Sequence, residues 1–536
     1  MTTTTAGTFT VRGGGTRPLA GTGTLLRFAL RRGRMTMPLW IGVTGLLVLS
    51  LPGSLKSVYA TPAERADVAR QMLTNSSLRA TYGPVFSDSL GGLTAWRIGG
   101  FAGVLAAVMS LIIVVRHTRD EEESGRQELV SAAMVGRRAP LTAALLAALV
   151  ANGALALLVA AGLAGQGGAG ALALGLTVGG VGMVFATMAA LVAQFTESAR
   201  LAKGLTGALL GAAFVLRAAG DAASDDGSSV LTWISPIGWL ENIRAFANER
   251  WWVLALFVAA IAAQGAAAYA LAGRRDVGMS FLPSRPGPAT GRLGAAGALA
   301  WRLQRGAVLG WSLGFLAAGG AFGGITKGAA DLVGDNARTR EIIERMGGQS
   351  GITDAFLAAM VNMLGLVAAL YIVSSVLRLH AEETSQRAEP LLAAVGRLRW
   401  AGGHLVIAFG GAVLIMLLGG LGLGLGHGSD LGPILGACLV QVPAVWTLGG
   451  LAVLLYGLSS RLAPGAWAAA GLALLLGWIG PALDLPQVVL GLSPFGHVSK
   501  LPGGTMAWAP VLLLTGIATG LTAAGLVSLR RRDLRT

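Results

Sequence analysis

Cysteine is almost absent from this sequence, and charged residues are scarce. Cys438 is the single cysteine, which excludes an intrachain disulfide and any cysteine-based metal site. The five histidines are scattered without the spacing of metal ligands, so no metal centre is expected. Charged residues make up only 12% of the 536 residues, whereas 54% are hydrophobic. With a mean hydropathy of +0.66, this balance is that of an integral membrane protein rather than a soluble globular one.

The sequence also lacks the motifs of a nucleotide-hydrolysing enzyme. No G-x-x-x-x-G-K-[ST] phosphate loop is present, because "GGITKG" at 323–328 does not have that spacing. The glycine-rich "GGLGLGLGHG" at 419–428 lies inside a hydrophobic run, where close helix packing is its expected role. No nucleophile, base or carboxylate pair is arranged for catalysis. The chain is therefore predicted to be no enzyme and to hold no cofactor of its own.

Long uncharged hydrophobic runs are what the sequence has instead. A helix needs roughly 20 apolar residues to cross the hydrocarbon core of a bilayer, and we find twelve runs near that length. Barrel strands would alternate apolar and polar residues, which is not the pattern here. We therefore predict an all-α integral membrane protein with twelve transmembrane helices. The predicted spans are 36–52, 98–115, 140–161, 171–195, 204–219, 251–272, 307–325, 355–377, 403–426, 431–458, 464–483 and 507–528.

The net charge of +15 indicates topology rather than a nucleic-acid partner. If the N-terminus is inside and the chain alternates through twelve spans, 28 of the 41 Lys and Arg residues lie on the cytoplasmic side. The opposite orientation would reverse this excess and break the positive-inside tendency. The sequence thus predicts a multi-pass protein of the cell membrane with both termini in the cytoplasm.

Short motifs recur in the two halves of the chain in the same order. Their separations are 261, 258 and 257 residues, and each half also opens on a basic segment that ends in tryptophan. Four matches with nearly constant spacing indicate a duplicated six-span unit. Because six spans return the chain to its starting side, the copies should be related by a pseudo-twofold axis along the membrane normal. The matching segments are Glu122–Glu128 and Glu383–Glu389, Ser235–Gly238 and Ser493–Gly496, and Arg274–Val277 and Arg531–Leu534.

This duplication predicts four parts of the chain. Residues 1–35 precede the first span as a cytoplasmic tail, and residues 36–275 form the first six-helix bundle. Residues 276–295 are a cytoplasmic linker, because their prolines and glycines break any helix. Residues 296–536 hold a second leader segment and the second six-helix bundle. The predicted fold is two fused, pseudo-twofold-related bundles.

Two kinds of external segment are predicted in each copy. In "TPAERADVARQML", Thr61 and Glu64 have the spacing of a capping box, which predicts a short external helix. The stretch "DNARTREIIERM" from Asp335 is its counterpart. Further along, Ser-Pro-x-Gly turns lie among aromatic residues suited to the membrane interface, and these stretches are expected to dip into the membrane and return. The turn residues are Ser235, Pro236 and Gly238 in the first copy and Ser493, Pro494 and Gly496 in the second.

The charged segment "RHTRDEEESGRQELV" at 116–130 stands between the second and third spans, and a related segment stands at the equivalent place in the second copy. Glu122 with Arg126, and Glu383 with Arg387, have the i,i+4 spacing of helical ion pairs worth about 0.2–0.5 kcal/mol each. So small a stabilisation does not explain why the segment occurs twice. A solvated loop is one interpretation. The repetition favours another: a pair of charged docking helices for two copies of a soluble partner, where complementary charge sets specificity.

The duplicated layout, the basic leader segments, the charged segment and the linker "GRRDVGMSFLPSRPGPA" at 273–289 together resemble a known family. They look like the permease subunit of actinobacterial ABC-2 type exporters for polyketide antibiotics and tetronasin resistance. The resemblance covers essentially the whole chain. It implies an exporter of hydrophobic or amphipathic compounds, powered by two copies of a separately encoded ATPase. ATP and magnesium would then be bound by that ATPase and not by this chain.

The resemblance also assigns roles to segments. The leaders at 25–35 and 299–305 match interfacial elbow helices, and the Ser-Pro-x-Gly regions match external re-entrant helices. The charged segments match coupling helices that rest in grooves of the ATPases. The second segment is less acidic and carries Pro390, so we expect the two ATPase contacts to differ. The implied coupling residues are Glu121, Glu122, Arg126 and Glu128, and Glu382, Glu383, Arg387 and Glu389. Residues that contact substrate are not predicted.

Two other functions are compatible with the residues: a gradient-driven twelve-helix carrier, and a non-transporting membrane sensor or immunity protein. Ion coupling normally requires ionisable groups inside the spans. Arg217 with Asp221, at the outer end of the fifth span, is the one obvious candidate, and we interpret it as a snorkelling interfacial pair. The neutral Asn152, Gln264, Asn362 and Gln441 are expected to hydrogen-bond across helices. ATP-driven export is therefore the favoured function.

Overall fold

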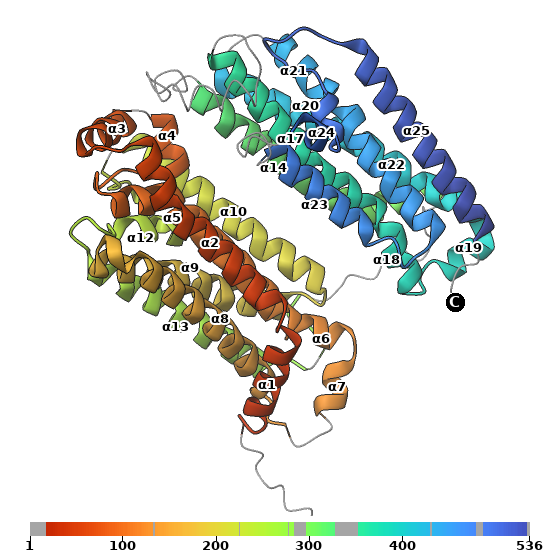
Figure 1. Ribbon diagram of the computed structural model, residues 1–536. Helices are drawn as coiled ribbons and strands as arrows, with labels where there is room; N and C mark the ends of the chain where they lie inside the picture. The colour runs from red at the N-terminus through yellow and green to blue at the C-terminus, as the bar shows by residue number, and fades with distance from the viewer. Residues whose placement is uncertain are drawn as a thin grey trace, which may run out of the picture. The chain divides into compact units, whose positions relative to one another are not determined.

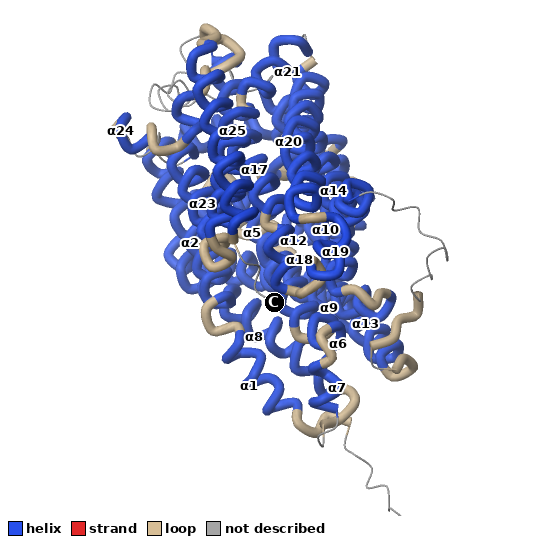
Figure 2. The backbone as a smooth tube through the Cα atoms, turned by 90° about the vertical axis from the view of Figure 1, so that its right-hand side faces the viewer, coloured by secondary structure: helices blue, strands red, loops and turns tan. Residues whose placement is uncertain are grey.

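The computed structural model describes residues 18–74, 76–131, 135–224, 226–276, 278–282, 296–326, 352–428, 431–478 and 486–532. These residues form helices and loops and no strand, as Figure 2 shows. The chain divides into two compact units, Met1–Pro286 and Gly287–Thr536, which we call unit 1 and unit 2 and describe separately. The predicted all-α class is confirmed.

Unit 1 is built on six long helices, which run side by side in Figure 1. They are α2 (Thr36–Val58), α5 (Leu90–Arg116), α8 (Ala139–Leu163), α9 (Gly168–Phe195), α10 (Ala199–Ala223) and α13 (Leu254–Ala272). Shorter helices connect them: α1 (Thr22–Arg32), α3 (Pro62–Thr74), α4 (Ser76–Tyr82), α6 (Arg119–Glu123), α7 (Arg126–Ser131), α11 (Val230–Ile234), α12 (Pro236–Asn242), η1 (Ala164–Gln166) and η2 (Trp251–Val253).

Unit 2 has a similar succession of elements. Its longer helices are α14 (Ala296–Thr326), α17 (Ile352–Val376), α20 (Arg397–His427), α21 (Leu431–Val440), α22 (Val442–Leu458), α23 (Gly465–Trp478) and α25 (Trp508–Arg531). The shorter ones are α18 (Arg378–Thr384), α19 (Glu389–Val395), α24 (Gln487–Leu490) and η3 (Pro494–His497). The helices α21 and α22 follow each other directly and together make one apolar stretch, Leu431–Leu458.

Eleven helices among the described residues are long and apolar enough to cross a membrane. Each coincides with one of the predicted spans, and the run predicted at 204–219 proves to be part of a 25-residue helix. The exception is the run predicted at 464–483. Its described part is the 14-residue helix α23, and the residues that follow, 479–485, lie outside the described ranges.

Small residues bring the helices of unit 1 close together. α9 packs against both α5 and α8. A Cβ atom added to Gly182 would stand 1.9 Å from Oδ1 of Asn152, so a larger residue there would displace the Asn152 amide. Asn152 of α8 donates a 2.7 Å hydrogen bond to Ser110 of α5, and Gln264 accepts one of 2.8 Å from Thr187. The predicted bonding across helices is confirmed for these two amides. It is not found for Asn362 or Gln441 among the described residues, and Oε1 of Gln441 is buried without a partner there.

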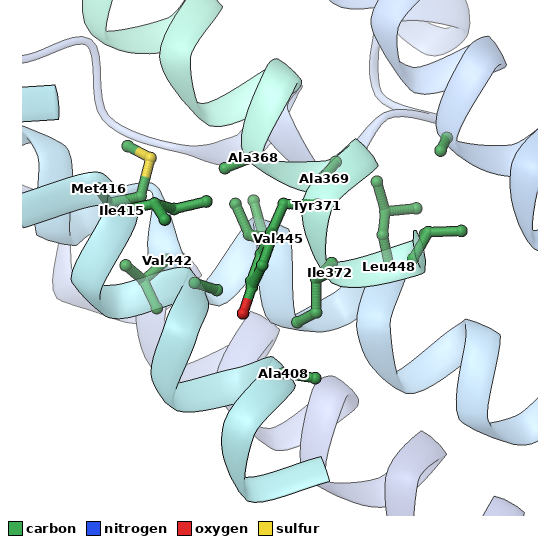
Figure 3. Packing of buried hydrophobic residues seen from close by; sticks show 14 of the residues in the cluster. Ala368, Ala369, Tyr371, Ile372, Ala408, Ile415, Met416, Val442, Val445 and Leu448 are labelled. Carbon is green, nitrogen blue, oxygen red and sulfur yellow. The ribbon is translucent and has the colours of Figure 1, made fainter. Parts of the chain in front are cut away.

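Glycines serve the same purpose in unit 2, where α14 packs along α20. A Cβ atom on Gly323 would lie 2.1 Å from the carbonyl oxygen of Leu423, and one on Gly422 would lie 2.2 Å from that of Leu316. The glycine-rich stretch at 419–428 therefore acts in helix packing, as predicted. Figure 3 shows the neighbouring core, where Tyr371 of α17 lies buried among small and branched residues of α17, α20 and α22.

The predicted capping box starts the helix α3 (Pro62–Thr74) of unit 1. The backbone N–H of Thr61 donates to Oε2 of Glu64 at 3.1 Å, and the N–H of Glu64 donates to Oγ1 of Thr61 at 3.2 Å. The helix α3 begins at the next residue, Pro62. The predicted counterpart from Asp335 and most of the predicted linker, at 283–295, lie outside the described residues.

Candidate functional site

Two short helices, α6 and α7, carry the first charged segment. α6 is little more than one turn, and three acidic residues occupy its start, where carboxylates interact favourably with the helix dipole. The helix is closed by Gly125, which has a φ of 71° in the left-handed region and donates its N–H to the carbonyl of Glu122. The chain then turns into α7.

Arg119 anchors α6 to the end of α9. Its side chain is 1% exposed and donates two hydrogen bonds, of 2.7 and 3.1 Å, to the carbonyl of Ala193. This carbonyl belongs to the last turn of α9, where helical carbonyls lack partners within the helix. Arg119 also donates to the carbonyl of Met279 at 3.0 Å and forms an ion pair with Glu122. The guanidinium therefore holds α6 in place and does not face solvent.

Glu122 is bound by Arg275, which follows the last long helix of unit 1. The two guanidinium Nη atoms reach the two carboxylate oxygens at 2.8 Å each. Arg275 also donates from Nε to Oε1 of Gln194 at 3.1 Å. The side chains of Glu122 and Arg275 are only 7% and 8% exposed. Such a bidentate pair, withdrawn from water, fixes the geometry of the two segments that it joins.

The other acidic residues of α6 bind the helices around it. Each of them has a partner, so every carboxylate of α6 is bound by another group of the protein. The contacts join Glu121 to Arg32 and, at 2.8 Å, to Arg126; Asp120 to Lys203 at 2.8 Å; and Glu123 to the backbone N–H of Ala199 at 2.9 Å. α6 is thereby tied to α1, α7 and the start of α10.

Unit 2 repeats this arrangement with α18 and α19. Glu383 accepts hydrogen bonds of 2.6 and 2.8 Å from Nη2 of Arg532, which follows the last long helix, α25. The same guanidinium donates to the carbonyl of Tyr456 at 2.8 Å and stacks over its ring at 4.9 Å. The neighbouring Glu382 pairs with Arg378 at 3.0 Å. α18 is closed by Gln386, whose φ of 58° is also left-handed.

Two of the repeated motifs thus bind each other. Glu122 and Glu383 occupy equivalent places in the charged segments, and Arg275 and Arg532 occupy equivalent places in the two Arg-Arg-Asp motifs. In each unit the charged helix is therefore ion-paired to the end of the last long helix. We call these pairs, Glu122–Arg275 and Glu383–Arg532, the clamps. The left-handed residues Gly125 and Gln386 are equivalent as well.

The predicted i,i+4 ion pairs do not form. Glu122 binds Arg275 instead of Arg126, and Glu383 binds Arg532 instead of Arg387. The physical reason is the left-handed residue that stands inside each spacing and ends the helix, so that the two side chains no longer share a helical face. The i,i+4 spacing requires a helix through residues 122–126 and 383–387, and in both units the helix ends inside this spacing.

The predicted coupling residues divide into buried and exposed ones. Glu122, Glu382 and Glu383 are buried or nearly so, and Glu121 has 17% of its side chain exposed. All four are ion-paired within their own unit. Arg126, with 51% of its side chain exposed, faces solvent. Glu128, Arg387 and Glu389 are exposed too. A soluble partner could reach only this second group.

Comparison with known proteins places the chain in a family. Residues 293–530 match the family described as "Multidrug efflux system permease Rv1217c, C-terminal domain". The chain is 41% identical over 533 residues to the multidrug efflux system permease protein Rv1217c of Mycobacterium tuberculosis, a match that covers 96% of this chain and 95% of the relative. The chain belongs to this family of multidrug efflux system permeases. It is thus a multi-pass membrane protein and the transport subunit of an efflux system, as the sequence predicts.

The Ser-Pro-x-Gly turns of the permease each separate two short helices. In unit 1, Ser235 lies between α11 and α12, donates to the carbonyl of Ala213 at 2.7 Å and accepts from the N–H of Ile237. Pro236 opens α12, and Gly238 leaves no room for a side chain, because a Cβ atom there would lie 2.0 Å from the carbonyl oxygen of Thr232. In unit 2, the buried Ser493 precedes η3, which begins at Pro494, and Gly496 packs closely on the carbonyl of Leu490.

The snorkelling interpretation of Arg217 and Asp221 is wrong for this permease. Their side chains are 1% and 0% exposed, and Nη1 of Arg217 lies 3.4 Å from Asp221 and 3.2 Å from Glu241 of α12. Arg217 also donates to the carbonyl of Thr81 at 3.1 Å, in the last turn of α4. These inward partners replace the water that a snorkelling side chain would reach.

Sequence reasoning missed several residues of these sites. Arg119 and Glu241 carry no signal of their own in a single sequence. Arg275 and Arg532 did have one, the repeated Arg-Arg-Asp motif, but nothing in the sequence shows that this motif binds the charged segment.

Proposed function

We propose that this permease is the membrane subunit of an ATP-driven ABC-2 type exporter, with two fused six-helix bundles and two copies of a separately encoded ATPase. The observation that carries this proposal is the repeated clamp. In each unit a charged helix is ion-paired to the end of the last long helix, through Glu122–Arg275 and through Glu383–Arg532. Two equivalent connections of this kind suit two copies of one partner, each of which binds ATP and magnesium.

The charged segments have the two sides that a coupling element needs. Their exposed side, with Arg126 and Glu128 in unit 1 and Arg387 and Glu389 in unit 2, offers charges to a complementary surface. Their buried side holds the clamp. Removing one partner of a buried ion pair costs about 3–5 kcal/mol, so the clamp does not separate easily. A movement of the exposed side is therefore transmitted to the last long helix. ATP-driven closure of the ATPases would tilt the bundles in this way.

The orientation follows from the same proposal. The charged segments lie in the cytoplasm, and so do both termini and the linker at 276–295. The Ser-Pro-x-Gly helices α11 and α12, and α24 and η3, then lie on the external side as re-entrant segments. The helix α23, with the residues that follow it, supplies the twelfth span. The pseudo-twofold axis relates residues 36–275 to the second bundle within 296–536.

The substrates proposed for this permease are hydrophobic or amphipathic compounds, including drugs of the kind named for its relative. A groove between α14 and α17 of unit 2 supports this, since its walls are almost entirely apolar. Such walls bury a lipid-soluble compound with few specific polar contacts. The lining includes Trp311, Phe315, Phe322 and Met363. The aromatic rings offer large contact areas, and the methionine adapts to different shapes.

Charge reversal tests the docking role. The double variant Arg126→Glu, Arg387→Glu is expected to lose co-purification of the ATPase and ATP-dependent uptake of a hydrophobic fluorescent dye into reconstituted vesicles, while membrane insertion stays normal. Arg70→Glu is the matched control, because Arg70 is 75% exposed on the helix α3. If the double variant still captures the ATPase and transports normally, the charged segments do not dock.

A gradient-driven carrier is the second candidate function, and the buried cluster of Arg217, Asp221 and Glu241 favours it, since buried ionisable groups mark ion pathways in membrane proteins. Vesicles that contain the permease and its ATPase should take up dye on addition of ATP without an imposed gradient. Uptake by the permease alone, driven by an imposed proton gradient, would favour the carrier instead.

A further inference from the structure

A buried group of three charged side chains lies at the far end of α10 from the charged helix α6. α10 begins beside α6, where Lys203 pairs with Asp120, and Asp221 lies near its other end. At 1.5 Å per residue, Lys203 and Asp221 are about 27 Å apart along the helix. The group consists of Arg217, Asp221 and Glu241. It is no part of the clamp or of the exposed docking surface.

The three side chains touch one another away from solvent. Nη1 of Arg217 lies 3.4 Å from Oδ2 of Asp221 and 3.2 Å from Oε1 of Glu241, and no side chain of the three is more than 8% exposed. Oδ1 of Asp221 accepts a 2.8 Å hydrogen bond from Thr232 of α11. Because both contact the same guanidinium nitrogen, the two carboxyl groups lie beside each other. Three helices, α10, α11 and α12, thus meet at this group.

Glu241 has one charged contact among the described residues, its ion pair with Arg217. Both of its carboxyl oxygens are buried, and neither receives a hydrogen bond from a donor group among the described residues. The backbone of Gly83 closes the space beside them, since a Cβ atom there would stand 2.7 Å from the carboxyl carbon. Among the described residues, a carboxylate in this position would have the Arg217 guanidinium as its one ionic contact, with both oxygens buried away from bulk solvent. The contact with a second carboxyl group is repulsive unless a proton lies between them.

The charges around the pair do not supply a second cation. Arg79 of α4 directs its guanidinium to the backbone carbonyls of Asp221 and Ala222, at 3.1 and 3.2 Å. Neither it nor any other group besides Arg217 forms an ion pair with Asp221 or Glu241 in the described ranges. The other charged or titratable side chains nearby are occupied: Arg244 over the ring of Phe86 at 4.4 Å, and Arg97 over the ring of Tyr82 at 4.2 Å. One cation therefore faces two carboxyl groups.

We propose that Asp221 and Glu241 form a proton-binding site: the two carboxyl groups share one proton at neutral pH, and the site releases it to water only when it becomes hydrated. With one proton the group of three is electrically neutral, which a buried site favours over a net negative charge. Glu241 lies outside the eleven candidate spans. Burial raises the pKa of its carboxyl group well above the ordinary value of 4.5, and this effect is larger than the opposing effect of the Arg217 guanidinium.

The described residues hold such a site in unit 1 and show none in unit 2, where residues 479–485, which follow α23, lie outside the described ranges. In the second Ser-Pro-x-Gly segment the place of Glu241 is taken by Ser499, and α23 contains no charged residue. A metal ion is a poorer occupant than a proton, because Arg217 already pairs with both carboxylates and the described residues offer no group of three metal-binding side chains. If the charged helices are cytoplasmic, as the proposed function has it, the site exchanges its proton with the external side.

Infrared spectroscopy of the purified, detergent-solubilised permease tests this proposal. At pH 7 the wild-type protein is expected to show the C=O band of a protonated carboxyl group, identified by its shift in heavy water. Glu241→Gln and Asp221→Asn should each lose this band, because each leaves one carboxylate paired with Arg217. Arg217→Gln should give about twice the band, since both carboxyl groups then become neutral by protonation.

Asp226→Asn is the matched control. Hydrogen bonds from Ser224 and Ser228 lower the pKa of the exposed Asp226 to about 2, so it is ionised at pH 7 and its replacement should leave the band unchanged. Absence of the band from the wild-type protein, or its persistence in both Glu241→Gln and Asp221→Asn, overturns the proposal. If Glu241→Gln does not fold, Asp221→Asn and Arg217→Gln still give opposite expected changes. None of these readouts involves the ATPase, so they stand or fall apart from the export mechanism.

Discussion

Breaking the clamp of unit 1 should release α6 from the rest of the unit. In Glu122→Gln, Arg275 loses the carboxylate that binds it through two hydrogen bonds, and Arg119 loses its ion pair as well. The side chains of Glu122 and Arg275 are both less than 10% exposed. Removing one partner of a buried ion pair costs about 3–5 kcal/mol. We expect the lower end, about 3 kcal/mol, because the glutamine oxygen still accepts a hydrogen bond and Arg275 keeps its bonds to Gln194 and Met279.

Hydrogen exchange measures this loss where it occurs. A loss of about 3 kcal/mol corresponds to a roughly 100-fold faster exchange of the amides of α6, if they exchange by local opening. Glu128→Gln, on the exposed side of α7, is the matched control and should change the exchange of α6 by less than tenfold. The long helices of unit 1 should keep their exchange rates in both variants.

A double-mutant cycle then separates the ion pair from other effects. Glu122→Gln and Arg275→Gln, singly and together, should show an interaction free energy of at least about 1.5 kcal/mol, since contacting charges are not additive. The same cycle on Glu383 and Arg532 should give a value of the same sign. If the two losses add within about 0.5 kcal/mol, the clamp is not the connection that we infer, and the proposed path of movement from α6 to the last helix fails with it.

Three further predictions concern other parts of the permease. Gly323→Ala should lower the free energy of unfolding by about 1–3 kcal/mol, because the added methyl group overpacks α14 against α20. Gly306→Ala should leave it unchanged, because Gly306 has open space around it. Thr61→Ala should cost about 1 kcal/mol, seen as faster amide exchange in α3 alone. Because the folded-state pKa of Glu241 is raised above its ordinary value of 4.5, the folded state holds a proton that the unfolded state has lost. Stability should therefore fall as pH rises above 4.5, by up to about 1.4 kcal/mol per pH unit until the folded pKa is passed. Glu241→Gln should remove this slope, and a slope unchanged by the substitution would contradict the assignment.

Hydrophobic patterning was sufficient for most of the fold. Eleven of the twelve spans could be located because a bilayer demands about 20 apolar residues per crossing, and such runs need no knowledge of their neighbours. The capping box of Thr61 and Glu64 was equally readable, because its two hydrogen bonds join residues three apart. The run at 464–483 resisted this reasoning, since its described helix ends after 14 residues at Trp478.

The site could be located but not resolved from the sequence. The i,i+4 spacing required a helix through Gly125 in unit 1 and through Gln386 in unit 2. The composition of both segments favours a helix and does not predict a left-handed residue, which is especially uncommon at a glutamine. The partners of Glu122 and Glu383 lie 153 and 149 residues away along the chain. Whether two side chains so far apart in the sequence meet and become buried depends on which helices pack together, and only the structure shows this packing. For the same reason Arg217 looked like an interfacial residue until Glu241 and the end of α4 were placed beside it.

The two clamps are equivalent, but the helices that carry them are not held equally. In unit 1 all four acidic residues of α6 have partners, on α1, α7, α10 and beyond α13. In unit 2 the acidic residues of α18 number two, and one of them, Glu382, pairs within its own helix. In the part of unit 2 that the structure describes, Arg532 alone ties α18 to the last long helix by an ion pair. The same push on the two exposed sides would therefore move α18 more easily than α6. The difference between the two halves of this permease then lies in how firmly each charged helix is held, more than in which residues form the clamp.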